Sequence, residues 1–190
     1  MRAMEEKILT SGKVLPGNVL KVGNFLNQQL DVNFLTEVGR EMARLFADAG
    51  VTKVITIEAS GIALATLTAQ ALSVPAVIVK KHFSANQSKE VYTANIDSFT
   101  HKNSYTAVVA REYLNEGDRV LIVDDFLAVG NAIRGLQKIL GEAGATLVGC
   151  AIAIEKAFQG GGDTLRAEGV RVESLAMVDS MSDDSVTFRR

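Results

Sequence analysis

The chain alternates between short apolar runs and longer segments in which apolar residues recur every three or four positions. A short run rich in β-branched residues predicts a buried strand, and the longer spacing predicts a helix with one buried face. The expected strands cover residues 53–58, 74–79, 119–124, 146–155 and 170–178. The expected helices cover residues 34–49, 62–72 and 129–143. Strands and helices that alternate in this way favour an α/β fold, a parallel sheet flanked by helices on both faces.

Charged side chains gather where the expected strands end. In parallel α/β sheets, ligands bind beyond the carboxyl ends of the strands. The residues at or just past these ends are Glu58, Lys80, Asp124, Asp125 and Lys156. The sequence therefore predicts a polar site that several strands build together at one edge of the sheet.

Two regions interrupt the alternation. Residues 89–99 and 104–114 are polar and β-rich, which predicts a two-stranded flap within residues 82–114. Residues 1–30 precede the core and predict a small N-terminal hood, either a lid or an arm of a dimer. No interdomain linker or internal repeat is visible, so we expect one domain over residues 1–190.

Composition and charge narrow the class of protein. The 20 basic and 22 acidic residues give a net charge of -2, without the basic excess of a nucleic-acid-binding surface. The single cysteine, Cys150, lies in an apolar run, which predicts a buried thiol and no disulfide within one chain. No apolar stretch of membrane-spanning length and no signal peptide are visible. We therefore expect a cytoplasmic protein that binds neither nucleic acid nor membranes.

The clearest chemical motif is an apolar run that ends in two adjacent carboxylates, Asp124 and Asp125, before a turn around Gly130 and a helix. Backbone N–H groups at a helix N-terminus bind anions, and the helix dipole favours negative charge there. Carboxylates beside an anion site suggest a cation or sugar hydroxyls as further partners. The motif therefore predicts a phosphorylated sugar bound together with Mg²⁺.

The same motif resembles the phosphoribosyl-pyrophosphate (PRPP) motif of type I phosphoribosyltransferases. Further strings are similar to the bacterial xanthine phosphoribosyltransferases within that family: Phe25–Asn27, Thr56–Ile62, Lys81–His82, Asp124–Ala128, Ile154–Lys156 and Val172–Ala176. The likeness covers residues 5–188, essentially the whole chain. It departs from the usual motif at Val129 and Ala132, which stand where threonine hydroxyls usually contact the 5′-phosphate.

The resemblance implies the type I phosphoribosyltransferase fold with its flap and hood, and a purine-salvage enzyme that transfers a pentosyl group. Xanthine and PRPP would give xanthosine 5′-monophosphate (XMP) and pyrophosphate. Because the transition state has oxocarbenium character, positioning and electrostatics would supply most of the catalysis. Mg²⁺ would be bound through PRPP or pyrophosphate, with no direct protein ligand expected. The implied assembly is a homodimer.

The resemblance also assigns roles to individual residues. The expected catalytic residues are Asp124 and Asp125, which accept hydrogen bonds from the ribose hydroxyls, and Lys81, which contacts pyrophosphate. The expected PRPP phosphate turn consists of Ala128, Val129, Gly130, Asn131 and Ala132. The expected pyrophosphate turn consists of Glu58, Ala59, Ser60 and Gly61. The expected xanthine-binding residues are Leu20, Asn27 and Lys156, with the Lys156 ammonium donating to O6 of the base.

Other substrates and other classes of protein fit the sequence less well. Hypoxanthine and guanine stay open as substrates, whereas adenine fits least because its amino group would face a cation at Lys156. A regulatory protein that senses PRPP without turnover is the alternative from another class, but residues 1–30 are too few and not basic enough for an added DNA-binding domain. No G-x-x-x-x-G-K-[ST] loop and no G-x-G-x-x-G after a strand occur, which excludes a P-loop nucleotide triphosphatase and a dinucleotide-dependent dehydrogenase.

Overall fold

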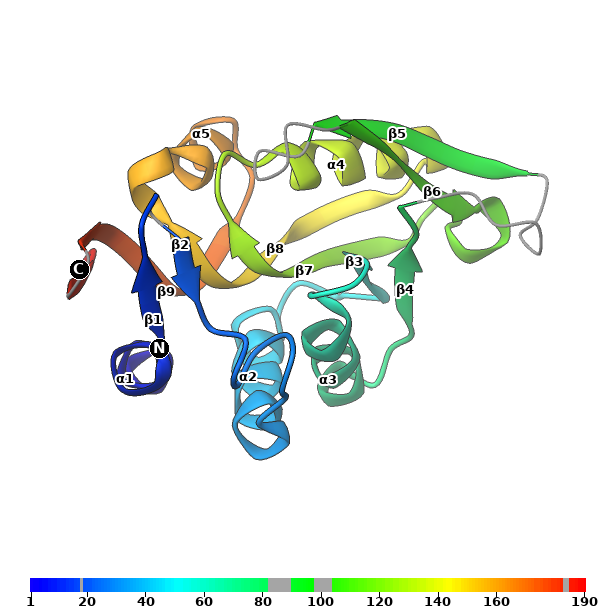
Figure 1. Cartoon of the computed structure of the whole chain (residues 1–190). Coiled ribbons are helices and arrows are strands. Elements are labelled where there is room, and N and C mark those ends of the chain that lie inside the picture. Colours follow the sequence, from blue (N-terminus) through cyan, green and yellow to red (C-terminus); the bar gives the residue numbers. More distant parts are fainter. Residues whose placement is uncertain (18, 82–89, 98–103, 183–184) are drawn as a thin grey trace.

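A mixed β-sheet runs through the centre of the protein, between two layers of helices (Figure 1). The computed structural model describes residues 1–17, 19–81, 90–97, 104–182 and 185–190. Within these residues the central sheet has six strands in the order β10-β9-β8-β7-β3-β4. The strands are β3 (Lys53–Ile57), β4 (Ala76–Val79), β7 (Arg119–Leu127), β8 (Thr146–Lys156), β9 (Val172–Ser182) and β10 (Ser185–Phe188).

The predicted strands are all present, and neighbouring strands from β4 to β9 pair in parallel. The predicted parallel sheet is confirmed over these strands, and one further strand at its edge, β10, pairs antiparallel with β9. That strand is short and partly polar, so no buried apolar run marks it in the sequence. β7 continues past its predicted end to Leu127, because β8 is long enough to pair with Phe126 and Leu127. Asp125 therefore lies inside β7 rather than just past its end, and Asp124 is followed by three more strand residues.

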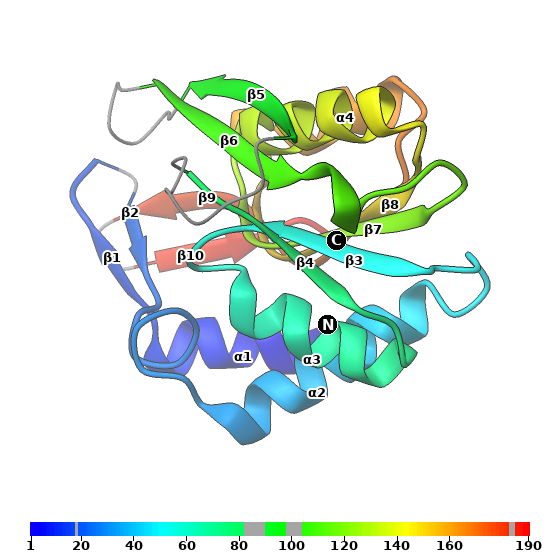
Figure 2. The same cartoon turned by 90° about the vertical axis from the view of Figure 1, so that its right-hand side faces the viewer.

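Different helices cover the two faces of the sheet (Figures 1 and 2). They are α1 (Arg2–Ser11), α2 (Val32–Leu45) and α3 (Ile62–Leu72) on one face, and α4 (Asn131–Ala143) and α5 (Gly161–Ala167) on the other. The bounds predicted for α3 are confirmed. α2 ends at Leu45, before its predicted end. The prediction ran too far because Phe46 and Ala49, in the turns that follow the helix, also pack against the core and continue the helical spacing of apolar residues.

The sheet separates two hydrophobic clusters, and successive residues of β7 contribute to them in turn. Leu121 and Val123 pack into the cluster beneath α1, α2 and α3. Val120 and Ile122 pack into the cluster beneath α4. Side chains alternate between the two faces of a strand. The side chains of the next two residues, Asp124 and Asp125, therefore leave the strand toward opposite faces of the sheet.

Residues 1–30 are packed against the core. They contain α1 and an antiparallel pair of strands, β1 (Lys13–Leu15) and β2 (Val19–Lys21). Met4 and Ile8 of α1 are buried in the same cluster as α2, and the amino group of Met1 donates a hydrogen bond to the carbonyl oxygen of Leu175 in β9. α1 was not predicted as a helix, because its two buried residues are too few to reveal a period.

The predicted strand pair between residues 82 and 114 is confirmed as β5 (Val91–Asp97) and β6 (Ser104–Ala110), which pair antiparallel over their whole length. A 3₁₀ turn (Arg111–Tyr113) follows, and one bridge, Lys80 with Val108, joins β6 to the end of β4. Residues 82–89 and 98–103 lie outside the described residues. Among the described helices, none has both the length and the apolar character needed to span a membrane.

Candidate active site

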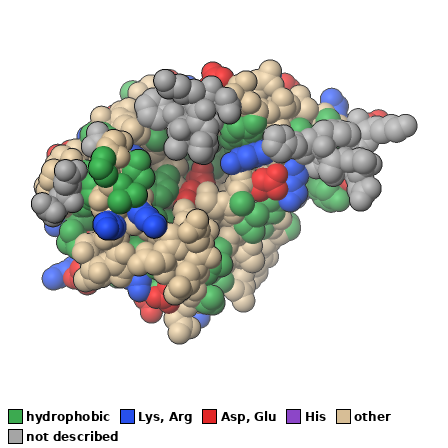
Figure 3. Space-filling view, viewed as in Figure 1, with side chains coloured by type: hydrophobic (Ala, Val, Ile, Leu, Met, Phe, Trp, Pro, Cys, Tyr) green, Lys and Arg blue, Asp and Glu red, His purple; other side chains and the backbone are tan. Residues whose placement is uncertain are grey.

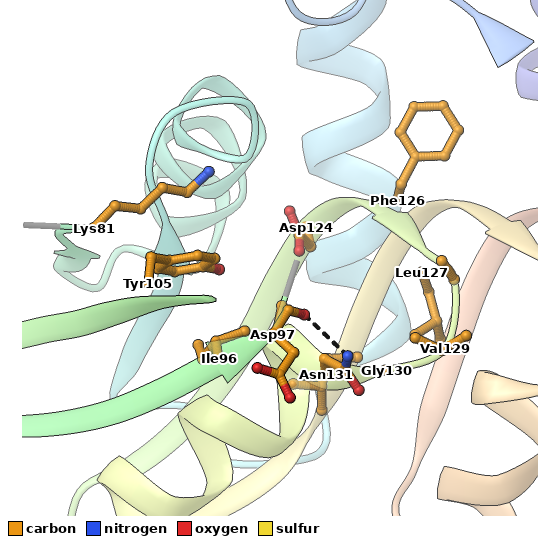
Figure 4. A pocket seen from close by; sticks show the side chains of 13 residues that line it. Lys81, Ile96, Asp97, Tyr105, Asp124, Phe126, Leu127, Val129, Gly130 and Asn131 are labelled. Atoms are coloured by element: carbon orange, nitrogen blue, oxygen red, sulfur yellow. Dashed lines mark hydrogen bonds between the residues drawn. The ribbon is translucent and has the colours of Figure 1, made fainter. Parts of the chain in front are cut away.

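A cavity of about 170 Å³ opens at the carboxyl end of β7. In the space-filling view an acidic surface lies in a hollow near the middle of one face, with basic side chains beside it (Figure 3). Figure 4 shows Lys81 and Tyr105 on one side of the cavity, the turn around Gly130 on the other, and Asp124 between them. The structure thus brings the Lys81 cation to a carboxylate and a glycine turn that come more than 40 residues later in the chain.

The two aspartates of β7 have different surroundings. Asp124 lines the cavity, and one of its oxygens accepts a hydrogen bond from the backbone N–H of Asp125 at 2.9 Å. The Asp125 carboxylate is only 6% exposed. It accepts hydrogen bonds from Asn27 Nδ2 and from Ser60 Oγ, each at 3.0 Å. Asp125 therefore links the N-terminal segment and the turn after β3 to the central strand.

The pKa of Asp124 lies well above the ordinary value of an aspartate. Burial is the largest cause, because it penalises the charged form, and the negative charge of Asp125 adds to it. The ammonium of Lys81 acts in the opposite direction, but more weakly. The cavity thus holds a carboxylate whose charged form would be stabilised by a cation or by hydroxyl donors.

The turn between β7 and α4 forms the second wall of the cavity, with Ala128, Val129, Gly130, Asn131 and Ala132 lining it. Gly130 has a φ of +91°, a conformation that favours glycine, and α4 begins at the next residue. The N-terminus of this 13-residue helix therefore faces the cavity with its positive dipole end. The Asn131 amide donates to the backbone oxygen of Asp97 in β5 at 3.0 Å (Figure 4).

The turn after β3 approaches both aspartates, with Ser60 contacting Asp125 and Gly61 lying near Asp124. Glu58 accepts a hydrogen bond from the backbone N–H of Lys81 at 2.8 Å and forms an ion pair with Lys80 at 3.1 Å. Burial raises the pKa of Glu58, but these two partners outweigh burial and lower it below its usual value. The Glu58–Ala59 peptide is cis. A Cβ atom on Gly61 would lie 3.1 Å from an Asp124 oxygen, so this turn closely approaches the cavity.

Lys80 and Lys81 point in different directions, as the alternation of side chains along a strand predicts. Lys80 pairs with Glu58, whereas Lys81 lines the cavity and holds its ammonium 5.2 Å from the centre of the Tyr105 ring.

The predicted xanthine-binding residues lie at separate places. The Lys156 ammonium, at the end of β8, lies 5.7 Å from the centre of the Phe126 ring. Burial lowers the pKa of Lys156. Asn27 contacts Asp125, whereas Leu20 is buried in β2 and lines another cavity beside Ile8 and Val186. The structure therefore joins Asn27 to the acidic pair and leaves Leu20 in the packing of the N-terminal segment.

Glu155, the neighbour of Lys156, is fully buried and is paired with Arg166 through hydrogen bonds of 2.6 and 3.0 Å. The cation that neutralises Glu155 is thus supplied by α5.

The sequence did not reveal two polar residues of the cavity, Asp97 and Tyr105. Both belong to the β5–β6 hairpin. Asp97 lies beside the turn around Gly130 and Tyr105 lies beside Lys81, and these positions depend on how the hairpin packs across α4, which no local pattern encodes.

This fold and this cavity define a class of α/β proteins that bind a phosphorylated ligand at the carboxyl ends of parallel strands. The family model for the phosphoribosyl transferase domain matches residues 27–168. The chain is 50% identical over 190 residues to xanthine phosphoribosyltransferase 1 of Clostridium perfringens, with both chains covered completely. It is 48% identical to xanthine phosphoribosyltransferase of Clostridioides difficile, again over the full length of both. The chain belongs to the xanthine phosphoribosyltransferases within the phosphoribosyltransferase family.

Solved structures confirm the predicted fold. Adenine phosphoribosyltransferase from Giardia lamblia, complexed with 9-deazaadenine, aligns with a TM-score of 0.79 and 21% identity, covering 93% of this chain and 98% of the other. Adenine phosphoribosyltransferase from Rhodothermus marinus aligns with a TM-score of 0.74 and 23% identity, covering 94% and 100%. At this level of identity the likeness establishes the fold alone.

Proposed function

We propose that this protein converts xanthine and PRPP to XMP and pyrophosphate. A bond forms between N9 of the base and C1′ of the ribose, while the bond from C1′ to the pyrophosphate oxygen breaks. The proton of N9 is released, and the two phosphates leave together as pyrophosphate. Support comes from the names of full-length relatives that are about half identical to this chain.

The observation that carries the proposal is the cavity shared by Asp124, Lys81 and the turn of residues 128–132. The backbone N–H groups of this turn and the dipole of α4 would bind the 5′-phosphate. Asp124, and Asp125 from the other face, would accept hydrogen bonds from the ribose hydroxyls. Lys81 and the turn of residues 58–61 would bind pyrophosphate and stabilise the charge that develops on it as the bond breaks.

Recognition of the base is proposed for Lys156, which lies over the Phe126 ring, together with Asn27, which contacts Asp125. A lysine ammonium donates to the O6 oxygen of xanthine and disfavours the amino group of adenine. The amide of Asn27 can donate or accept, so it suits the O2 and N3 edge of the base. Leu20 would support this edge from within the N-terminal segment.

Mg²⁺ is proposed as the cofactor, and it would enter with PRPP. No cluster of three or more metal-binding side chains occurs among the described residues. The carboxylates that line the cavity, Asp97 and Asp124, would face a cation that takes its ligands from phosphate oxygens and water. When bound, the ion would neutralise the charge of pyrophosphate.

The proposal extends to the assembly and its surroundings. We propose a homodimer in the cytoplasm, consistent with a single buried cysteine, Cys150, and with exposed apolar side chains on the N-terminal segment. The described strands of the flap, β5 and β6, would close over the substrates from the side of the cavity that they line.

The first prediction is the reaction itself. The purified protein, incubated with Mg²⁺, PRPP and one base at a time, should form XMP from xanthine and little or no AMP from adenine, as measured by chromatography of the nucleotide products. Omission of Mg²⁺ is the control. Formation of AMP in preference to XMP would contradict the role of Lys156. Binding of PRPP without any nucleotide product would instead favour a PRPP sensor.

A further inference from the structure

In the turn of residues 128–132, the groups that can bind an anion are almost entirely backbone groups. It contains no hydroxyl side chain, and its single polar side chain, the amide of Asn131, donates to the backbone oxygen of Asp97. Among the described residues, no hydrogen-bond acceptor contacts the backbone N–H of Val129 or Gly130. A phosphate at this turn would therefore be bound by backbone groups, whose direction depends on the path of the main chain.

The path of this turn is held from behind by the segment that begins α5. The backbone N–H of Gly161 donates to the carbonyl oxygen of Ala128 at 3.2 Å. A Cβ atom at Gly161 would lie 2.2 Å from that oxygen and 2.9 Å from the nitrogen of Gly130. Backbone thus rests directly on backbone. Leu165, which is fully buried, lies beneath Gly130, since a Cβ atom there would be 3.5 Å from its Cδ1.

α5 is in turn anchored to the sheet. Arg166 forms two hydrogen bonds to the buried Glu155 carboxylate at the end of β8, and Ser174 of β9 donates to the same group. Gly162 lies against this carboxylate, where a Cβ atom would be 2.0 Å from a Glu155 oxygen. Gly161 and Gly162 are neighbours with different contacts: Gly161 meets the turn, and Gly162 meets the ion pair.

We infer that Gly161 is a positioning residue for phosphate binding. It ties the Ala128 carbonyl to α5 and thereby leaves the N–H groups of the following residues available to the ligand. This role rests on the proposed function, since it presumes that the turn binds the 5′-phosphate. An alanine at this position cannot fit unless the turn moves, and displacements of about 1 Å in a positioned site reduce its effectiveness by up to about a hundredfold.

The test compares XMP with xanthosine, which differ only in the 5′-phosphate, by titration calorimetry of the full chain. The unsubstituted protein should bind XMP more tightly than xanthosine. Gly161→Ala should reduce this preference by about tenfold or more, with the affinity for xanthosine retained. Gly162→Ala places its methyl group against Glu155, whose ion pair with Arg166 anchors α5, so it should reduce the same preference through a different contact. Gly141→Ala, on an open face of α4, should leave both affinities unchanged.

The outcomes separate the inference from the proposed function. If the unsubstituted protein binds the two ligands equally, the proposed function fails and the role of Gly161 fails with it. If it prefers XMP and Gly161→Ala keeps the full preference, the role of Gly161 alone is overturned. If Gly161→Ala yields no folded protein, Leu165→Val decides: a smaller loss of the same preference supports the inference, and an unchanged preference overturns it.

Discussion

Asp124 and Asp125 are adjacent and chemically identical, yet the fold gives their carboxylates different partners. Asp124 faces a cavity that holds one lysine, whereas Asp125 accepts hydrogen bonds from Asn27 and Ser60. The doublet could be found from the sequence because two carboxylates follow an apolar run. The division between its members could not, because it depends on residues 65 and 98 positions away in the chain.

The raised pKa of Asp124 has a consequence for stability. The folded protein holds the Asp124 proton more tightly than the unfolded chain, whose aspartates have a pKa of about 3.9. Stability present at low pH is therefore lost as the pH rises through the folded pKa. Asp124→Asn removes the ionising carboxyl and with it this loss of stability. The Tm of the variant at pH 7 should therefore exceed that of the unsubstituted protein, and the difference between the two Tm values should shrink towards pH 4. For a chain of this size, 1 kcal/mol corresponds to about 2–4 °C.

Asp118→Asn is the matched control with the opposite sign. Burial raises the pKa of Asp118, but the Lys53 ammonium and the N–H of Asn115 outweigh it and lower the pKa. This carboxylate stabilises the fold above its unfolded pKa, and the contribution is lost as the pH falls through the folded pKa. Asp118→Asn should therefore lower the Tm at pH 7. A lower Tm for Asp124→Asn at the same pH would contradict the raised pKa of Asp124.

At the scale of elements, the last two residues of β8 contact different parts of the structure. Lys156 lies over Phe126 on one side, while Glu155 is buried against α5 on the other. α5 itself was missed in the sequence, because it is seven residues long and begins with glycines, which show no helical period. A short helix of this kind is stabilised by its tertiary contacts, here chiefly the ion pair with Glu155 and the burial of Leu165.

Arg166→Met tests this anchoring. It leaves the fully buried Glu155 carboxylate without its cation, which should lower the free energy of unfolding by about 3–5 kcal/mol, measured by urea denaturation. Arg134→Met is the control, because the Arg134–Glu168 pair is roughly half exposed on both sides and should contribute about 0–1 kcal/mol. Equal effects of the two substitutions would show that the Glu155–Arg166 pair does not anchor α5.

At the scale of the whole molecule, the N-terminal segment is part of the core. Met4 and Ile8 lie in the same buried cluster as α2 and β9, although the sequence suggested only a lid or an arm. The sequence did not reveal this burial because the apolar residues of the segment are few and widely spaced. Their burial depends on contact with β9, which is distant in the chain.

Ile8→Ala should therefore destabilise the entire fold by about 2–5 kcal/mol in a single unfolding transition, followed by circular dichroism in urea. Leu9→Ala changes the next residue, which is 59% exposed, and should have an effect near zero. A separate unfolding transition at lower urea concentration in either variant would indicate instead that residues 1–30 unfold independently of the core.

The sequence by itself determined the alternation of strands and helices, the acidic doublet and the glycine turn before α4, because these depend on periodicity and on neighbours in the chain. Only the tertiary structure decided which side chains share a cavity. Lys81, Tyr105 and Asp97 share a cavity with Asp124 because β4 lies one strand away from β7 in the sheet, with β3 between them, and because the β5–β6 hairpin packs against α4 and β4. The support of the turn by Gly161 likewise arises from backbone contact between segments more than 30 residues apart. Such contacts follow from the packing of whole elements, and no local pattern of residues records them.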